Sequence, residues 1–374
     1  MTSTASIERY IGLMSGTSLD GVDGALVEFD GDRLRVAGFA SLPFPAALKA
    51  ELLALNTSGA DELHRAALAA NALAGIYADV VHQLLQAAQL GAADVRAIGA
   101  HGQTVRHRPG LFDGTGYTLQ LNSPALLAER TGIAVVADFR SRDVAAGGQG
   151  APLVPAFHQA VFGQAGSDVC VLNIGGIANL SVLGAQGDVL GFDCGPGNAL
   201  MDHWCERHSG QPYDAGGAWA AQGRVLPDLL QRLLAEPYLH QTPPKSTGRD
   251  LFHPAWLEFH LRTHGDAAPA DVQATLTELT ARACATSVTS YGNKSKRLAV
   301  CGGGARNGYL MERIAAALPG VAVQTTDALG LPPQQVEAAA FAWLARQTVH
   351  NLPGNLPQVT GATGPRILGA IYPA

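Results

Sequence analysis

The sequence predicts an α/β protein whose two halves each begin with two strands joined by a glycine-rich turn. Short β-rich runs bounded by Gly, Ser or Asp alternate with long segments of helical periodicity, a pattern typical of mixed α/β folds. YIGLMSGTSLDGVDGALVEF at the start and CVLNIGGIANLSVL near the middle share a strand–turn–strand arrangement. Two unrelated hairpins would give the same pattern, so this likeness alone leaves a duplication open.

The composition is that of an ordinary globular protein. The chain has 374 residues, of which 47% are hydrophobic and 15% charged, enough for two domains with cores of their own. The formal net charge of −6 excludes a basic field for nucleic acid or an anionic membrane. Five scattered cysteines without a CxxC pair favour a reducing cytoplasm over a disulfide framework. The first residues lack a secretory pattern and no run of about 18 apolar residues occurs, so no membrane association is expected.

Strands and helices are expected alternately along the first half. Apolar runs bounded by turn residues predict strands at 10–14, 25–29, 34–39, 95–100, 117–121 and 133–137. Apolar residues spaced by three or four predict helices at 46–56 and 61–90. Ser123 followed by Pro124 indicates a helix start, with proline in the first turn, where its missing N–H is tolerated.

The second half repeats this style after a Gly/Ala/Pro-rich stretch at 141–155, which we predict to be the domain hinge. Strands are expected at 169–174, 178–183, 189–192 and 298–300, with a helix from about Pro196 and further helices between. The Pro- and Gly-rich tail after Asn351 has no strong pattern, although 366–371 fits a short edge strand.

The first glycine-rich turn, MSGTSLDGVDG at 14–24, is a candidate phosphate site. Backbone N–H groups freed in such a turn, with the hydroxyls of Thr17 and Ser18, form a concave anion site. Asp20 or Asp23 would then hold Mg²⁺, a hard ion that accepts one or two carboxylates beside phosphate oxygens. An ordinary Asx/Gly hairpin turn is the alternative.

Two further glycine runs support the hypothesis of a nucleotide-binding site. NIGGIAN at 173–179 is a second turn of the same kind, and CGGGARN at 301–307 follows a strand and opens a helix, where a nucleoside can lie against bare backbone. A strand-to-helix connection that needs positive φ explains the latter equally well. No GK[ST] ends a glycine run and no GxGxxG occurs, so P-loop and dinucleotide folds are not supported.

Several charged or polar residues stand where strands end. Asp193 is expected at the end of a strand, where a rigidly held carboxylate suits a general base; a helix or turn cap is the alternative. Arg140, beside Asp138, fits an anionic substrate group, or else an inter-strand salt bridge at the hinge. His101 and Gln103 also end a strand, and Glu337 is alone on an apolar helix, where a solvated or capping role is usual.

Taken together, the chain resembles the anhydro-N-acetylmuramic acid kinase family, within the sugar kinase, Hsp70 and actin superfamily. The matching segments span nearly the whole chain in family order: IGLMSGTSLDGVD (11–23), HGQT (101–104), DFRSRDVAAGGQGAPLVP (138–155), NIGGIANL (173–180), FDCGPGN (192–198), CGGGARN (301–307) and VEAAAFAWLA (336–345). Cys194 is a departure, because the family pattern usually has Thr there, which puts a side-chain contact at 194 in doubt.

The resemblance implies a fold of two duplicated RNase H-like, actin-like ATPase domains around a central nucleotide and substrate cleft. Residues 1–140 with 352–374 would form the N-terminal domain, and 141–351 the C-terminal one. It also implies ATP and Mg²⁺ as cofactors, a cytoplasmic homodimer, and 1,6-anhydro-N-acetylmuramic acid from peptidoglycan turnover as the substrate. Such enzymes open the anhydro ring with water and phosphorylate O6, giving N-acetylmuramic acid 6-phosphate.

The resemblance also distributes roles over the residues. The phosphates and the metal would contact Gly16, Thr17, Ser18, Leu19, Asp20, Gly21, Val22 and Asp23, with Asp20 as the metal ligand. The phosphates would be contacted from the other side by Asn173, Gly175 and Gly176. The adenosine would contact Gly302, Gly303, Gly304 and Asn307. Asp193 would be the base, Arg140 would bind the lactyl carboxylate, and His101, Gln103, Asp138 and Glu337 would orient the sugar. Two alternatives share the phosphate motifs: a plain sugar kinase that phosphorylates a free hydroxyl, and a non-catalytic nucleotide switch of the Hsp70 or actin type.

Overall fold

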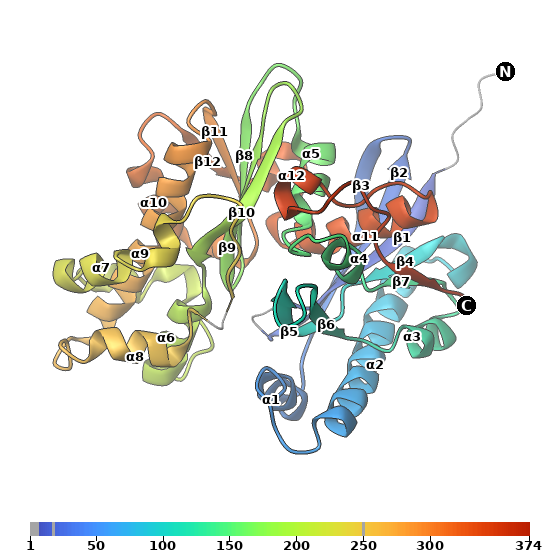
Figure 1. The fold of residues 1–374 in the computed structure, drawn as a ribbon, viewed down its shortest axis with the longest axis horizontal. Coiled ribbons are helices and arrows are strands. Elements are labelled where there is room, and N and C mark those ends of the chain that lie inside the picture. Colours follow the sequence, from blue (N-terminus) through green and yellow to red (C-terminus); the bar gives the residue numbers. More distant parts are fainter. Residues whose placement is uncertain (1–6, 17–18, 249–250) are drawn as a thin grey trace. The chain divides into compact units, whose positions relative to one another are not determined.

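The computed structural model describes residues 7–16, 19–248 and 251–374. The chain forms two compact units, the first Met1–Val161 with Gln335–Ala374 and the second Phe162–Gln334 (Figure 1). Both boundaries differ from the expected ones at 140/141 and 351/352. The stretch 141–155 and the helix that carries Glu337 therefore belong to the first unit, because both pack on its own elements.

The sheet of the first unit has the order β13-β7-β4-β1-β2-β3. Its strands are β1 (Glu8–Met14), β2 (Gly21–Asp30), β3 (Arg33–Pro43), β4 (Ala97–Ala100), β7 (Val135–Ala137) and β13 (Ala370–Tyr372). β1, β2 and β3 form an antiparallel meander, and β4 and β7 continue the sheet in parallel from β1. A separate hairpin joins β5 (Gln103–Pro109) to β6 (Gly116–Leu121).

The second unit repeats this topology. Its strands are β8 (Val169–Ile174), β9 (Ile177–Leu183), β10 (Val189–Pro196), β11 (Arg297–Cys301) and β12 (Ala322–Thr325), in the order β10-β9-β8-β11-β12. β8, β9 and β10 are again an antiparallel meander, followed by parallel β11 and β12. The shared order confirms the predicted duplicated RNase H-like fold.

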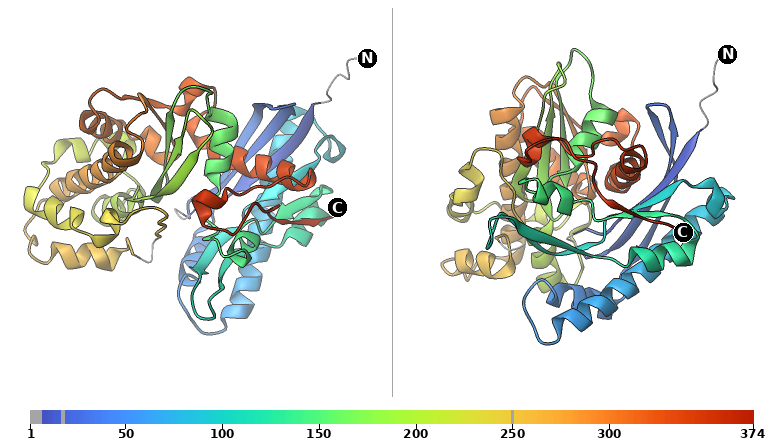
Figure 2. Two further views of the ribbon diagram at one scale, coloured as in Figure 1. Left: turned by 45° about the horizontal axis from the view of Figure 1, so that its top comes forward. Right: turned by 45° about the vertical axis from the view of Figure 1, so that its right-hand side comes forward.

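Two helices cover opposite faces of the first sheet, α2 (Glu62–Ala88) and α11 (Val336–Val349) (Figure 2). A Cβ at Gly12 would lie 1.8 Å from the carbonyl oxygen of Ala338 in α11, whereas a Cβ at Gly24 would lie 2.3 Å from Val80 of α2. Gly24 is opposite Leu13, the neighbour of Gly12, and neighbouring strand residues point to opposite faces. Glycine at position 12 thus lets the backbone of α11 lie directly on β1.

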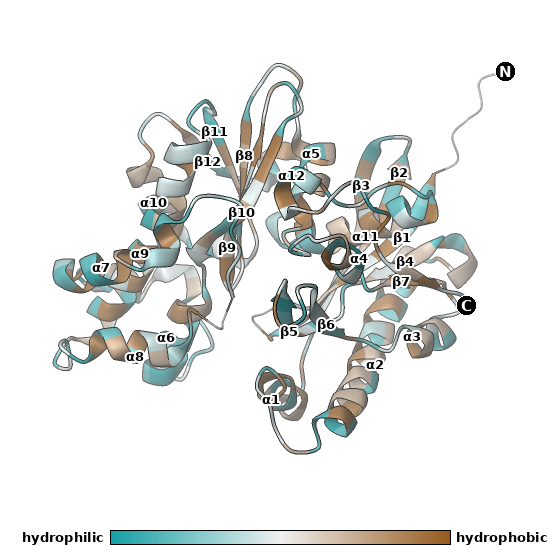
Figure 3. Ribbon diagram, viewed as in Figure 1, coloured by the Kyte–Doolittle hydropathy of each residue, from teal (hydrophilic) through white to brown (hydrophobic). Residues whose placement is uncertain are grey.

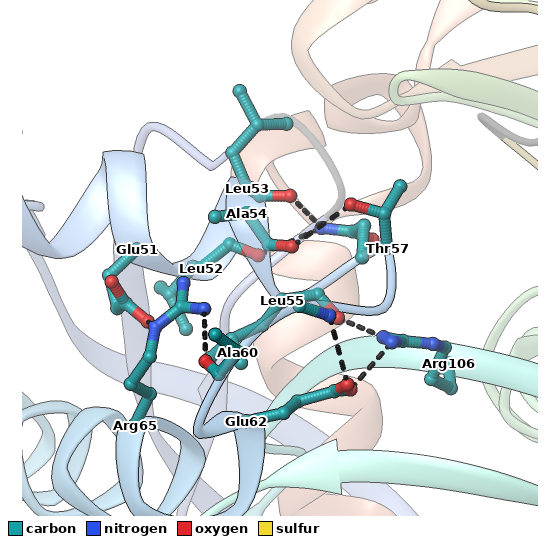
Figure 4. Close-up of polar contacts among 12 residues, drawn as sticks. Glu51, Leu52, Leu53, Ala54, Leu55, Thr57, Ala60, Glu62, Arg65 and Arg106 are labelled. Carbon is teal, nitrogen blue, oxygen red and sulfur yellow. Dashed lines mark hydrogen bonds and ion pairs between the residues drawn. The ribbon is translucent and has the colours of Figure 1, made fainter.

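Around these, shorter helices complete the first unit: α1 (Ala46–Ala54), α3 (Pro124–Thr131), α4 (Ser141–Ala145), α5 (Val154–Phe162), α12 (Pro357–Thr360) and the 3₁₀ turn Ala92–Asp94. Arg106 of β5 forms hydrogen bonds to both ends of the connection between α1 and α2 (Figure 4). Arg106 donates to the carbonyl oxygen of Leu55 and, over 2.5 Å, to Glu62. Ser123 precedes α3 and Pro124 begins it, as the sequence predicts.

The long helix α2 is apolar enough to span a membrane by length and composition, but 56% of its most apolar window is buried in the fold. Hydrophobic and hydrophilic residues mix along it (Figure 3). Its buried side, including Leu73, Tyr77, Val81 and Leu84, belongs to the core on β1 and β2. These contacts are those of a core helix, in agreement with the helix predicted at 61–90.

Helices of the second unit are α6 (Ala199–Ser209), α7 (Pro227–Leu234), α8 (Pro254–Leu261), α9 (Pro269–Tyr291) and α10 (Gly308–Ala317). Short 3₁₀ turns lie at Ala215–Gly217, Ala220–Gln222, Pro237–His240, Gly303–Arg306, Thr326–Leu329 and Pro333–Gln335. α9 is buried over most of its length and contributes Leu276, Leu279, Cys284 and Val288 to the core with β8 and β10. α9 therefore contributes a large part of the core beside this sheet.

A buried histidine in α5 makes the stability of the first unit depend on pH. Burial lowers the pKa of His158 to about 3, whereas the unfolded side chain has its ordinary value near 6.5. Below that value the unfolded chain binds more protons, so the contribution to stability is complete above pH 6.5 and is lost as the pH falls toward 3. Between pH 7 and pH 5 the loss amounts to about 2 kcal/mol.

We expect the variant His158→Phe to lose this part of the pH dependence. Urea unfolding at pH 7 and pH 5 should show a difference in unfolding free energy about 2 kcal/mol smaller than in the unmodified protein. Because the readout is the difference between two pH values, any constant destabilisation by the larger ring cancels. An unchanged difference would contradict the assignment.

Candidate functional site

The carboxyl ends of three strands meet at one edge of the first sheet. β1 and β4 are parallel with Leu13 opposite Ala100, and β4 and β7 are parallel with Ala100 opposite Ala137. The segments that follow these strands contain the first glycine-rich turn, His101 to Gln103, and Asp138 to Arg140. The structure therefore gathers at one edge most of the polar residues that the sequence singled out in this unit.

The first glycine-rich turn is bound to the segment after β4. Gln103 donates from Nε2 to the carbonyl oxygen of Gly16 over 3.2 Å, and Ser15 donates from Oγ to that of Gly102 over 3.2 Å. Leu19 has a left-handed backbone with φ 57°, and its N–H donates to the oxygen of Gly16. Thr17 and Ser18, predicted to bind phosphate, lie outside the described residues.

Not every residue predicted in this turn is exposed. Leu19 and Val22 are buried in the core, and a Cβ at Gly21 would lie 2.2 Å from the carbonyl oxygen of Leu42 in β3. Asp20 is exposed and Asp23 is half-buried in β2. Only the backbone of the buried residues is suited to contact a ligand, whereas Asp20 presents its carboxylate to solvent.

Arg140 and His101 form a hydrogen-bonded pair at this edge. Arg140 donates from Nε to Nε2 of His101 over 3.0 Å, and from Nη1 to the carbonyl oxygen of Gly150 over 2.7 Å. Burial, and secondly the charge of Arg140, hold the pKa of His101 well below its usual 6.5. His101 is therefore neutral, and because Nε2 accepts a hydrogen bond, its proton is on Nδ1.

Two polar atoms of this group form no hydrogen bond of good geometry among the described residues, although the backbone of Ser15 and Gly102 lies close enough to the His101 ring to oppose part of the lowering of its pKa. They are Nδ1 of His101 and Oε1 of Gln103, both fully buried, one a donor and the other an acceptor. Buried polar atoms in native proteins are almost always paired, so each calls for a water molecule or a ligand atom.

Asp138 lies apart from this pair. It is exposed, has φ 61°, and accepts a hydrogen bond of 2.5 Å from Ser141. It lines a cavity of about 520 Å³ together with Arg142 and Arg366, among others. Among the described residues the structure gives it no hydrogen bond or ion pair to Arg140, the neighbour with which the sequence associated it.

Glu337 occupies the first turn of α11 and is half-buried. The next residue, Ala338, is the one whose carbonyl lies against Gly12 of β1. Further along the helix, the ring of Phe341 is 4.7 Å from that of His101. α11 therefore places Glu337 in the same unit as His101 and Arg140, not in the second unit, where the expected boundaries had put it.

In the second unit, the strands β8 and β11 bring two glycine runs side by side. Cys301 is opposite Asn173 in the parallel pairing. Gly302 has φ 79°, and a Cβ there would lie 2.5 Å from Oδ1 of Asn173 and 2.7 Å from the carbonyl oxygen of Ile174. Position 302 thus requires glycine for its conformation and for its close approach to the NIGGIAN turn.

The remaining glycines differ in what surrounds them. The nearest atoms to a Cβ at Gly175 and Gly303 would be 3.7 Å and 3.5 Å away, so these two positions have room beside the backbone. Gly304, by contrast, packs tightly on Ile174. The carbonyl of Gly176, with that of Gly175, accepts hydrogen bonds from the N–H groups of residues 197–199, which ties this turn to the start of α6.

Asn307 has a structural role in the fold. It is the N-cap of α10, and its Oδ1 accepts a hydrogen bond of 3.0 Å from the N–H of Leu310. This use of the side-chain oxygen is typical of asparagine at a helix start. A contact with a nucleotide would have to come from its other polar atoms.

Three hydrogen bonds hold Asp193 in place. Its Oδ2 accepts from the N–H of Thr247 over 2.9 Å, its own N–H donates to the carbonyl of Lys245 over 3.2 Å, and its carbonyl accepts from the hydroxyl of Tyr238 over 2.9 Å. The predicted strand end is wrong, because β10 continues to Pro196 with a bulge between Asp193 and Gly195. Asp193 does not cap α6, whose N-cap is Asn198.

Sequence reasoning missed the segment that holds Asp193. Lys245 is 9% exposed, donates to the carbonyl oxygens of Tyr238 and Leu239, and lies 4.9 Å from the ring of Tyr238. Burial lowers the pKa of Lys245, partly opposed by Cys194 and Asp193. A lysine after two prolines was a weak signal, since only the fold brings it to β10. Cys194 itself lies in the core, 1% exposed.

A family model described as anhydro-N-acetylmuramic acid kinase matches residues 8–374. The chain belongs to this family. Relatives named anhydro-N-acetylmuramic acid kinase include one from Variovorax paradoxus, 66% identical over 98% of this chain and 99% of that protein. Another, from Cupriavidus pinatubonensis, is 64% identical over 98% of each.

Among solved structures, an activator of 2-hydroxyisocaproyl-CoA dehydratase from Clostridium difficile is similar with a TM-score of 0.48 at 12% identity. The similarity covers 92% of this chain and 96% of that one. The family assignment therefore rests on the family model and on the close relatives, and the chain is a kinase.

Proposed function

We propose that this kinase opens the 1,6-anhydro ring of 1,6-anhydro-N-acetylmuramic acid with water and transfers a phosphoryl group from ATP to O6, with Asp193 as the base. The observation that supports this most directly is the fixation of Asp193, whose backbone and one carboxylate oxygen are held by Tyr238, Lys245 and Thr247. A general base needs such a defined position.

The chemistry needs only one base. Asp193 removes a proton from water as the water oxygen bonds to the anomeric carbon. The bond from that carbon to O6 breaks, and its electron pair remains on O6. O6 then bonds to the γ-phosphorus, and the bond to ADP breaks. Ordinary glycosidases need a second acid for the leaving oxygen, a role that the phosphoryl group takes here.

Residues of the first unit would hold the sugar. Arg140, fixed by His101 and Gly150, matches the lactyl carboxylate in charge and shape. The N–H of His101 Nδ1 and the Oε1 of Gln103 are suited to hydroxyl or acetamido atoms, because both are buried and form no hydrogen bond of good geometry among the described residues. Asp138, which lines a cavity with Arg142 and Arg366, and Glu337 complete the proposed set.

ATP would bind through backbone at the glycine runs. Residues 16–23 with Asn173, Gly175 and Gly176 would contact the phosphates, and residues 302–304 with Asn307 the adenosine. The exposed Asp20 fits a magnesium ligand, because Mg²⁺ takes one or two carboxylates beside phosphate oxygens and water. When bound, Mg²⁺ would neutralise charge on the transferring phosphoryl group.

The deciding experiment is mass spectrometry of the product formed in ¹⁸O-labelled water with ATP and Mg²⁺. We expect a product heavier than the anhydro sugar by one phosphoryl group and one labelled water, with the label at C1. Phosphorylation without incorporated water would instead identify a plain sugar kinase, and ATP consumption with an unchanged sugar would favour a nucleotide switch.

We expect Arg140→Ala to raise the KM for the anhydro sugar about tenfold to a hundredfold, since a hydrogen bond to a charged group contributes about 1.5–3 kcal/mol. The KM for ATP should stay within twofold. Arg33→Ala, which removes an exposed arginine of β3, is the control for loss of a positive charge. An unchanged sugar KM in Arg140→Ala would remove Arg140 from the proposed site.

A cytoplasmic location and a homodimer are further parts of the proposal. All five cysteines are buried thiols, which suits a reducing compartment. The dimer is supported only by the family resemblance.

A further inference from the structure

A completely buried carboxylate lies three residues after Arg140 and has no part in the chemistry described above. Asp143, in α4, is 0% exposed and accepts three hydrogen bonds. Its Oδ2 accepts from the N–H of Gly150 over 2.8 Å, and its Oδ1 from Nδ2 of Asn355 and Oγ of Thr360, each over 2.7 Å. Such a dense set of donors fixes a carboxylate in one orientation.

These hydrogen bonds join segments that are far apart in the sequence. Backbone contacts run beside them, from the N–H of Gln149 to the carbonyl of Thr360 over 2.7 Å and from Thr363 to Ala146 over 2.9 Å. A Cβ at Gly148 would lie 2.2 Å from Oδ2 of Asp143. The glycine run after α4 is therefore wrapped around this carboxylate, with the C-terminal tail packed on its other side.

The network leads directly to Arg140. Gly150 donates its N–H to Asp143 and accepts, through its carbonyl, the hydrogen bond from Nη1 of Arg140. Its φ is 65°, and a Cβ there would lie 2.8 Å from Val144. One residue thus connects the buried carboxylate to the guanidinium, and Arg140 in turn donates to His101.

We propose that Asp143 is a positioning residue for substrate binding: its carboxylate fixes Gly150, whose carbonyl holds Arg140 in the orientation that meets the substrate carboxylate. Asn355 and Thr360 bind the other oxygen of this carboxylate and tie the C-terminal tail to α4, which stabilises the fold there. This inference rests on the proposed role of Arg140.

The test compares two variants that each remove a hydrogen bond of the same carboxylate. Asp143→Asn retains the size of the side chain but presents an NH₂ group to three converging donors, so at least one bond is lost. Thr360→Val removes only the hydroxyl and leaves the bond to Gly150. We expect Asp143→Asn to raise the KM for the anhydro sugar about tenfold, because Arg140 would no longer be held in the orientation that binds the substrate. The KM for ATP should stay within twofold.

Thr360→Val should lower Tm while leaving both KM values within twofold. If Asp143→Asn changes the two KM values together, or leaves the sugar KM unchanged, the positioning role is excluded. If Asp143→Asn fails to fold, Asp143→Ser is the second variant, because it leaves room for water beside the same donors. We again expect a higher KM for the sugar and an unchanged KM for ATP. If Asp143→Ser does not show this difference, the positioning role is likewise excluded.

A double variant separates this inference from the function on which it rests. On the Arg140→Ala background, Asp143→Asn should add no further rise in the sugar KM, because its effect passes through Arg140. Additive effects would mean that Asp143 acts by another route. If Arg140→Ala itself leaves the sugar KM unchanged, the proposed role of Arg140 in binding the substrate is wrong.

Discussion

Replacing Asp193 by Asn should lower kcat by about a hundredfold to ten-thousandfold, the usual contribution of a general base. The amide cannot take the proton of the attacking water, but it keeps the size of the side chain and can still accept the hydrogen bond from Thr247. ATP binding should therefore persist. Steady-state assays of ADP release give kcat, and calorimetric titration with ATP gives the affinity.

The control for Asp193→Asn lies at the far end of the same strand pair. Asp188, exposed in the turn between β9 and β10, offers the same Asp-to-Asn change away from the glycine runs. Asp188→Asn should keep kcat within twofold. A near-normal kcat in Asp193→Asn would show that another group accepts the proton, whereas loss of ATP binding would indicate damage to β10 or its neighbours.

Gly12→Ala should destabilise the first unit by about 3 kcal/mol or more, at the upper end for overpacked cores. The new Cβ would lie 1.8 Å from the carbonyl oxygen of Ala338 and 2.5 Å from the backbone nitrogen of Ala342. Both are backbone atoms of α11, so no side-chain rotation relieves the overlap and the helix itself must move. Since α11 carries Glu337 and contacts His101 through Phe341, activity should fall as well.

Thermal unfolding measures the effect of Gly12→Ala, with Gly38→Ala as the matched control. A Cβ at Gly38 in β3 would meet its nearest atoms at 3.5 Å and 3.7 Å, ordinary contact distances, and its backbone is not left-handed. We expect a Tm for Gly38→Ala close to that of the unmodified protein. A similar Tm for Gly12→Ala would contradict the close packing of α11 on β1.

Prediction from the sequence succeeded where the signal is local. The turns at 14–24 and 173–179 and the alternation of the flanking residues suffice to predict both hairpins, because pleat and turn chemistry act over a few residues. It was less successful at strand ends. β10 continues past Asp193 because Thr247, Lys245 and Tyr238, more than forty positions later, hold it there.

By itself, the sequence determined the class of fold, the glycine turns, the family and the residue types that the chemistry requires. Only the tertiary structure decided that Glu337 belongs to the first unit, that Asp138 lines a cavity with Arg142 and Arg366, and that Gly150 joins Asp143 to Arg140 by hydrogen bonds. The hydrogen bond from Asn355 to Asp143 joins residues 212 positions apart. Local propensity and residue spacing cannot predict such pairs, because the packing of the whole sheet brings the two residues together.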